Sequence, residues 1–385
     1  MIIGVLKEHH PDEQRVSLVP AQVPKLLKSG HQVLLEQEAG LASGYTDQEY
    51  QDKGAGLLPR SEILKQAEVL FLVRAGANAD PSFINDVSKL NPGTLVIGMM
   101  DPYEPHKIFT EYANKNIKAF SLELIPRITR AQSMDVLSSM ANLAGYKAGL
   151  LAASALPKMF PMMMTAAGTV VPAKVFILGV GVAGLQAIAT TKRLGAVVSA
   201  YDVRPAVKDQ VLSLGAKFVE MPLETDSAEG TGGYAKAMDE EFYRKQRELL
   251  TGVLKETDVV ITTAAIPGKK SPVLVTEEMV KAMPQGSVIV DLAVERGGNC
   301  ELSEPGKTVV KHGVTILGPV NLPATLGYHA SQLYSKNIET FFYNLFTKEG
   351  ELSLEREDEI IKSTLILHQG KAGNEEIAQR LGLPV

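Results

Sequence analysis

The sequence Lys174-Val-Phe-Ile-Leu-Gly179-Val-Gly181-Val-Ala-Gly184 joins a short apolar run to a glycine-rich turn, and a segment compatible with a helix follows. This order predicts a strand, a tight turn and a helix, which is how a dinucleotide-binding unit begins. The first glycine permits the turn, the second lets backbone N–H groups approach a pyrophosphate, and the third allows the helix to pack closely on the strand. We expect the phosphates at the helix N-terminus, held by Gly179, Val180, Gly181, Val182, Ala183 and Gly184.

A second predicted strand, Val197–Tyr201, ends at the sequence Asp202-Val203-Arg204. Asp202 lies about 20 residues beyond the turn, where a carboxylate accepts hydrogen bonds from both adenosine-ribose hydroxyls and repels a 2′-phosphate. The sequence therefore favours NAD(H) over NADP(H), although Arg204 leaves room for a phosphate. Because strand, helix and acid are in register, we interpret the glycines as a nucleotide site rather than as a packing turn.

Composition excludes several classes of protein. The chain has 385 residues and a formal net charge of −5, so it is long enough for two or three domains and offers no basic surface for nucleic acid or anionic lipid. Prolines and a lysine interrupt its most apolar region, 148–168, so we expect no direct membrane insertion. Cys300 is the only cysteine, which fits a reducing, cytosolic setting. The histidine spacing predicts no metal site.

The order of the predicted elements indicates two domains. Up to about residue 125, β-rich runs alternate with amphipathic segments, which predicts a parallel sheet with helices on both faces. A long helical pattern from Asp135 follows, then a second alternating set from Val175, and the segment from about Asn321 is expected to fold back onto the first domain. We predict an α/β protein with two Rossmann-like, doubly wound parallel-sheet domains joined by long helices, the first of residues 1–135 plus 325–385 and the second of residues 136–324.

Ligands in such sheets bind beyond the carboxyl ends of the strands, so the residues that follow each strand are candidates for a site. Ala264 and Ala265 follow one predicted strand of the second domain, and Asp291 and Glu295 follow another. Their loops fit a cover over adenine and the nicotinamide ribose, and they fit ordinary turns as well.

A second group of polar residues precedes the connecting helix, at the expected junction of the domains. Arg127 can contact a phosphate or the nicotinamide amide, Gln132 and Ser138 can hydrogen-bond a carboxamide, and Asp135 can orient either group. The same spacing fits a helix cap formed by Ser133 or Asp135.

One segment, 222–238, has neither periodicity nor apolar anchors. Structureless loops of this length are usually lids or disordered segments. Its one aromatic residue, Tyr234, could fold over a bound nucleotide or make only local contacts, and the pattern leaves both open.

Taken together, these residues closely resemble the NAD(H)-binding component of proton-translocating nicotinamide nucleotide transhydrogenases, which share a superfamily with alanine dehydrogenases. The resemblance covers nearly the whole chain. Its most specific blocks are residues 127–139, 160–169, 179–189, 232–236 and 291–295.

The resemblance implies that the loop 127–138 contacts the nicotinamide, that Asp202 holds the adenosine ribose, and that Gly233 and Tyr234 lie on a mobile loop that closes over the nucleotide. It implies hydride transfer of the Re/Si-specific type between NAD(H) and NADP(H) held on a partner subunit. It also implies membrane-spanning partner chains, a homodimer, and a cytoplasmic location at the inner face of the cell membrane. We therefore expect NAD as the cofactor and catalytic roles for Arg127, Gln132, Asp135, Ser138 and Tyr234.

An alanine-dehydrogenase-like oxidoreductase is the main alternative. Such an enzyme moves a proton as well as a hydride, so it needs an acid or base and a cation for the substrate carboxylate. By resemblance, its lysine and histidine are replaced here by Leu72 and Met99, whereas Arg15 is retained. Hydride transfer between two nicotinamide rings needs no proton transfer, which fits those replacements. His106, close to Met99, keeps the alternative open, and a non-catalytic NAD(H)-sensing module is a third hypothesis.

Overall fold

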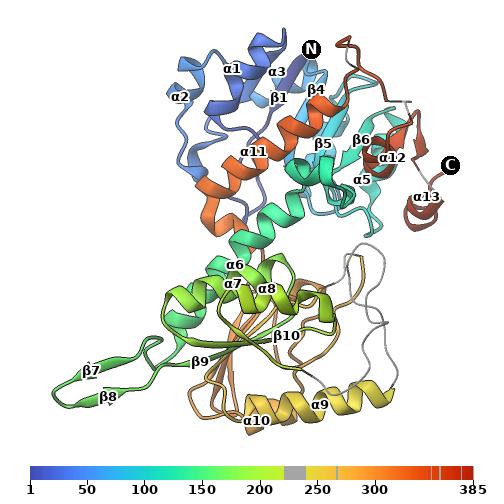
Figure 1. Cartoon of the computed structure of the whole chain (residues 1–385). Coiled ribbons are helices and arrows are strands. Elements are labelled where there is room, and N and C mark those ends of the chain that lie inside the picture. The colour runs from blue at the N-terminus through green and yellow to red at the C-terminus, as the bar shows by residue number, and fades with distance from the viewer. Residues whose placement is uncertain (221–239, 266–267, 348, 355–356, 374, 385) are drawn as a thin grey trace. The chain divides into compact units, whose positions relative to one another are not determined.

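The computed structural model describes residues 1–220, 240–265, 268–347, 349–354, 357–373 and 375–384 (Figure 1). The chain divides into two compact units, Met1–Met140 with Pro323–Val385 and Ala141–Leu322, which we call unit 1 and unit 2. The first changeover falls inside the long helix α6 (Val136–Ala155). Both units carry a parallel-rich sheet with helices, which confirms the predicted α/β class.

Unit 1 contains an eight-stranded sheet in the order β17-β16-β6-β5-β4-β1-β2-β3. Only the two strands nearest the C-terminus run antiparallel to their neighbours, because β16 pairs with β6 and then turns back into β17. The strands are β1 (Ile2–Val5), β2 (Gln32–Glu36), β3 (Gly56–Leu58), β4 (Val69–Arg74), β5 (Leu95–Met99), β6 (Lys118–Ser121), β16 (Leu365–His368) and β17 (Lys371–Ala372).

Helices cover both faces of this sheet because the side chains of each strand alternate between two apolar surroundings. In β4, Leu70 and Leu72 join a cluster formed with α3, α4, α5 and α13. Phe71 points the other way and meets Phe342 of α11 edge to face, with 5.4 Å between the ring centroids (Figure 1). The helices are α1 (Val23–Lys28), α2 (Asp47–Asp52), α3 (Arg60–Gln66), α4 (Phe83–Val87), α5 (Lys107–Asn114), α11 (Gly327–Asn344), α12 (Glu359–Thr364) and α13 (Glu375–Leu381).

Unit 2 contains a seven-stranded sheet in the order β11-β10-β9-β12-β13-β15-β14, parallel except for the edge strand β14. The chain order reverses between β9 and β12, so the carboxyl ends of these two strands mark the place where doubly wound sheets bind ligands. The strands are β9 (Lys174–Leu178), β10 (Val197–Tyr201), β11 (Lys217–Phe218), β12 (Val259–Thr262), β13 (Val288–Asp291), β14 (Thr308–Lys311) and β15 (Val314–Leu317).

The sheet of unit 2 also buries both faces. Ile177 of β9 packs with residues of α6 and α7, whereas its neighbour Phe176 packs with residues of α9 and α10. The helices that belong to unit 2, besides the later turns of α6, are α7 (Val182–Arg193), α8 (Lys208–Ser213), α9 (Glu240–Leu254) and α10 (Glu277–Ala282). Across the described residues, no helix combines the length and the apolar character that crossing a membrane requires.

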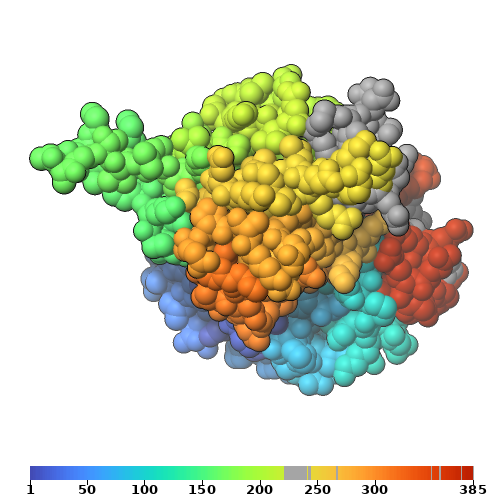
Figure 2. Space-filling model, turned by 90° about the horizontal axis from the view of Figure 1, so that it is seen from below, coloured from blue at the N-terminus to red at the C-terminus, as the bar shows by residue number. Residues whose placement is uncertain are grey.

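A hairpin of β7 (Met163–Thr165) and β8 (Gly168–Val170) projects from the body of unit 2 (Figures 1 and 2). The sequence analysis identified this methionine-rich segment only as a block of resemblance. Strands of three residues are too short to show a periodic pattern. The hairpin leaves apolar side chains in solvent, since Met164 is 77% and Val171 is 76% exposed.

Candidate functional site

The glycine turn of unit 2 follows β9 as predicted. Gly179 has φ of +90° and donates its N–H to the Tyr201 carbonyl at 2.9 Å. A Cβ on Gly184 would lie 2.1 Å from the Gly179 carbonyl oxygen, so only glycine allows α7 to pack this close to the end of β9. Two of the three glycines thus meet the steric requirements that the sequence predicted.

The third glycine leaves room for a ligand. Gly181 is the N-cap of α7, no side chain caps the helix there, and a Cβ on Gly181 would meet no protein atom within 4 Å. Unpaired N–H groups at a helix start, with the positive end of the helix dipole, favour an anion. The residues from Gly179 to Gly184 therefore fit the pyrophosphate of a dinucleotide.

Asp202 lies beside this turn at the end of β10. Its carboxylate accepts the Val180 N–H at 2.7 Å and the Arg204 N–H at 2.9 Å. The Arg204 guanidinium forms an ion pair with it, at 2.7 Å between Nη2 and Oδ2, and Val203 between them partly packs against the α9 face of the sheet. The sequence analysis considered Arg204 only as a contact for a phosphate, and the structure shows that it pairs with Asp202.

The loop after β12 is fixed to the glycine turn. The Thr263 hydroxyl donates to the Gly179 carbonyl at 2.8 Å. Asn299 holds the next residue from both sides, because its Oδ1 accepts the Ala264 N–H at 2.9 Å and its Nδ2 donates to the Ala264 carbonyl at 2.8 Å. Ala265, which follows, is exposed. Thr263 and Asn299 position this loop, and no local sequence signal indicated either role.

Asp291 is fully buried at the end of β13, so its carboxylate cannot touch a ligand in this conformation. It accepts five hydrogen bonds, all between 2.6 and 3.0 Å, and two of its donors are the backbone N–H groups of Asn299 and Cys300. Asp291 therefore orients Asn299, and through it Ala264. Its other donors are the Ala293 N–H and the hydroxyls of Thr262 and Ser303.

Three further residues of this region differ in accessibility. Glu295 lies on the short helical turn Val294–Arg296 and is exposed. Burial raises the pKa of the Cys300 thiol to about 12, which agrees with its interpretation as a buried side chain without a catalytic role. Gly233 and Tyr234 lie outside the described residues.

The polar segment of unit 1 forms a six-residue turn, Thr129–Met134, that is anchored by buried side chains. Ala131 and Met134 are buried, and Asn337 of α11 donates to the Ser133 carbonyl at 2.9 Å. Arg130 pairs with Asp358, the N-cap of α12, at 2.9 Å. These anchors leave the two flanking polar residues, Arg127 and Gln132, exposed on unit 1.

Asp135 and Ser138 bind each other at the start of α6. The Asp135 carboxylate accepts the Ser138 N–H at 2.8 Å and the Ser138 hydroxyl at 2.6 Å. This is the capping arrangement that the spacing also allowed. Both side chains are half-buried, so a contact with a ligand requires Asp135 to serve a second partner besides its cap.

A charged cluster lies at the carboxyl ends of β1 and β4 in unit 1. Glu13 binds Arg15 at 2.6 Å and Arg74 at 2.8 Å, and the side chains of Glu13 and Arg15 are 0% and 4% exposed. Burial alone would raise the pKa of Glu13, but the two guanidinium groups lower it to about 2. Burial and the nearby charge of Glu13 raise the pKa of Glu8 to about 7. Arg15 is thus neutralised by a carboxylate of its own chain.

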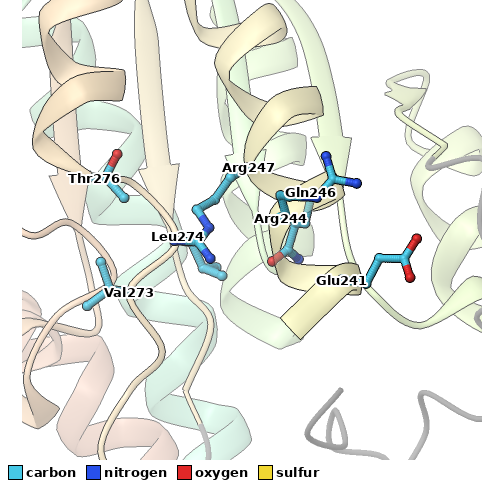
Figure 3. Close-up of a pocket in the computed structure, with 7 residues that line it drawn as sticks. All are labelled: Glu241, Arg244, Gln246, Arg247, Val273, Leu274 and Thr276. Atoms are coloured by element: carbon cyan, nitrogen blue, oxygen red, sulfur yellow. The ribbon is translucent and has the colours of Figure 1, made fainter. Parts of the chain in front are cut away.

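A pocket of about 710 Å³ lies beside α9 in unit 2 (Figure 3). It shares no lining residue with the glycine turn, and Arg244 on its wall is paired with Glu248 at 2.6 Å. Its shape alone therefore does not make it the nucleotide site. Its lining residues are Glu241, Arg244, Gln246, Arg247, Val273, Leu274 and Thr276.

Comparison with known proteins adds to this geometry. Residues 4–144 match the N-terminal domain and residues 148–375 the C-terminal domain of the alanine dehydrogenase/PNT family. A chain of the NAD(P) transhydrogenase alpha subunit from Rhodospirillum rubrum is 47% identical over 96% of this chain and 97% of that protein. A crystal structure of transhydrogenase from Sinorhizobium meliloti has a TM-score of 0.86 and 45% identity, and covers 97% of this chain and 100% of that one. A structure of L-alanine dehydrogenase has a TM-score of 0.81 at 24% identity, covering 99% of each chain.

Proposed function

This chain belongs to the alanine dehydrogenase/PNT family, and we propose that within it the chain is the NAD(H)-binding component of a nicotinamide nucleotide transhydrogenase of the Re/Si-specific type. Bound NAD(H) supplies or accepts a hydride, and NADP(H) held on a partner subunit is the other reactant. The observation that carries the proposal is the glycine turn with Asp202 beside it, in a chain 47% identical to a transhydrogenase subunit over nearly its whole length.

The residues of unit 2 bind and orient the nucleotide in this proposal. Gly179, Val180, Gly181, Val182, Ala183 and Gly184 hold the pyrophosphate, Asp202 with its neighbours Val203 and Arg204 lies at the adenosine ribose, and Ala264, Ala265 and Glu295 border the nucleotide. Asp291 acts indirectly, through Asn299. Gly233 and Tyr234 are proposed to contact the nucleotide from their own segment.

The exposed residues of unit 1 orient the nicotinamide in this proposal. Arg127 and Gln132 offer hydrogen-bond donors to its carboxamide, while Asp135 and Ser138 fix the start of α6 beneath them. No residue is asked to move a proton, because a hydride passing between two nicotinamide rings leaves no proton to transfer. Positioning of the two rings supplies the catalysis.

Three observations in unit 1 disfavour an amino-acid dehydrogenase. Leu72 and Met99 are apolar and buried, so neither position can supply an acid, a base or a cation. Arg15 is held by Glu13. His106 is exposed and serves as the N-cap of α5, where its Nδ1 accepts the Ile108 N–H at 3.3 Å.

A mixture of this chain with an NADP⁺-loaded partner subunit tests the proposal. With NADH that carries deuterium on the transferred position of C4, we expect deuterium in the NADPH formed, because the transfer is direct. The mixture with alanine, or with pyruvate and ammonia, should give no turnover. Turnover with alanine would overturn the proposal in favour of a dehydrogenase, and NADH binding without any reduction of NADP⁺ would identify a sensing module.

The chain is also proposed to be a homodimer that docks on the cytoplasmic membrane face through its partner subunits. The exposed apolar side chains of the β7–β8 hairpin support the homodimer, since an apolar patch of this kind usually marks an interface. Sedimentation should give twice the 41.5 kDa of one chain. Met164→Asp should yield monomer, whereas Val310→Asp, at a comparably exposed position, should not. A monomeric wild-type chain would contradict this aspect of the proposal.

A further inference from the structure

The carboxylate of Asp202 is fully occupied by donors of its own unit. Oδ1 accepts the Arg204 N–H at 2.9 Å and Arg204 Nε at 2.8 Å. Oδ2 accepts the Val180 N–H at 2.7 Å and Arg204 Nη2 at 2.7 Å. A carboxylate offers about four lone-pair sites, two on each oxygen, so none is left for a further donor.

These four donors divide into two kinds. The N–H groups of Val180 and Arg204 belong to the backbone of the glycine turn and of the chain just after β10, so the fold keeps them in place. The other two donors belong to the Arg204 side chain, which can rotate away. They take one lone pair on each oxygen, and a ribose diol also needs one acceptor site on each oxygen when its two hydroxyls bind a carboxylate.

We propose that the Arg204 guanidinium occupies the acceptor sites of the adenosine ribose, so that NAD(H) binds by displacing it from Asp202. This inference rests on the proposed function of the glycine turn. The displaced pair is a strong one, because charge-assisted bonds from a fork of two nitrogens to both oxygens are stronger than neutral hydrogen bonds. The side chains of Arg204 and Asp202 are only 15% and 6% exposed, so solvent screens their attraction weakly.

The exchange has two consequences for the nucleotide. Part of the binding free energy is used to break the ion pair, which weakens NAD(H) binding and speeds its release. A ligand without ribose hydroxyls can leave Arg204 in place and loses nothing by it. The effect of Arg204 is thus specific to the diol, whereas a purely structural role of Arg204 would affect all adenine nucleotides equally.

Equilibrium titration of the full chain with NADH, ADP and 2′,3′-dideoxy-ADP tests the inference. Arg204→Met keeps most of the apolar stem and removes the fork. We expect it to tighten NADH and ADP binding by roughly five- to tenfold, since a largely desolvated ion pair no longer competes, and to leave dideoxy-ADP binding unchanged. Arg204→Lys, with a single ammonium group in place of the fork, should give a smaller gain.

Arg193→Met is the matched control, because it removes one arginine from the exposed surface of α7 in the same unit and should change none of the three affinities. Weaker or unchanged binding of NADH and ADP to Arg204→Met would overturn the inference, as would an equal gain for dideoxy-ADP. If the wild-type chain binds no NADH, the proposed function itself fails. If the wild type binds NADH and Arg204→Met binds it no more tightly, only the displacement by Arg204 is refuted.

Discussion

Gly184→Ala is expected to destroy the nucleotide site, with NADH affinity falling by roughly a hundredfold, as displacements of about 1 Å can cost in a preorganised site. The added Cβ would lie 2.1 Å from the Gly179 carbonyl oxygen, a backbone atom that cannot rotate away. Relief requires α7 to move off the end of β9, and with it the N–H groups proposed to hold the pyrophosphate. The free energy of unfolding should fall by about 1–3 kcal/mol, the usual cost of overpacking. Fluorescence titration and urea unfolding measure the two effects.

Gly181→Ala separates the fold from the site. Its Cβ would meet no protein atom within 4 Å, and the backbone at Gly181 is extended, with φ of −84° and ψ of −166°, so the free energy of unfolding should change by less than about 0.5 kcal/mol. NADH affinity should still fall sharply, because the new methyl group lies where the pyrophosphate approaches the helix. If Gly181→Ala binds NADH normally, the phosphates do not lie at this turn. If Gly184→Ala is as stable as the wild type, the close packing of α7 is not what requires glycine there.

The glycine turn could be predicted from the sequence because each of its requirements is local. The apolar run of β9, the three glycines and the acid after β10 follow one another within about 30 residues of chain. The alternation of strands and helices likewise predicted both sheets, since parallel strands buried on two faces are recognisable as short apolar runs.

Contacts between distant segments could not be predicted in this way. Asn299 acts on Ala264, which is 35 residues away in sequence, and only the neighbouring positions of β12 and β13 bring them together. The same holds for Asn337, which anchors Ser133 across 204 residues. The sequence indicated Asp291 as a residue at the end of a strand, but only the fold shows that the loop 293–303 wraps around its carboxylate.

The spacing around Asp135 was ambiguous for a different reason. A side chain that can cap a helix offers the same oxygens that could bind a carboxamide, so residue type does not separate the two roles. The structure shows the cap, with both Asp135 oxygens bound to Ser138. The ligand role of Asp135 stays a prediction.

Asp291→Ala is expected to cause the largest loss of stability among these substitutions, roughly 3–5 kcal/mol in the free energy of unfolding. The substitution leaves five donors without their acceptor in a place that water does not reach, since Asp291 is 0% exposed. An unpaired buried donor costs more than its hydrogen bond contributed, so the loop 293–303 must rearrange. Asn299 then releases Ala264, and NADH affinity should fall as well although Asp291 touches no ligand. Urea unfolding followed by circular dichroism measures the loss of stability.

Ser303→Ala is the matched control for Asp291→Ala, because it removes a single hydroxyl donor, at 2.6 Å from Oδ2, and leaves the carboxylate and its four other donors. It should cost only about 1 kcal/mol, the net contribution of one hydrogen bond, and should barely change NADH affinity. A loss for Asp291→Ala no larger than that for Ser303→Ala would show that the loop holds its shape without the carboxylate. Asp291 would then not be the group that orients Asn299, and the loop after β12 would depend on Thr263 alone for its attachment to the glycine turn.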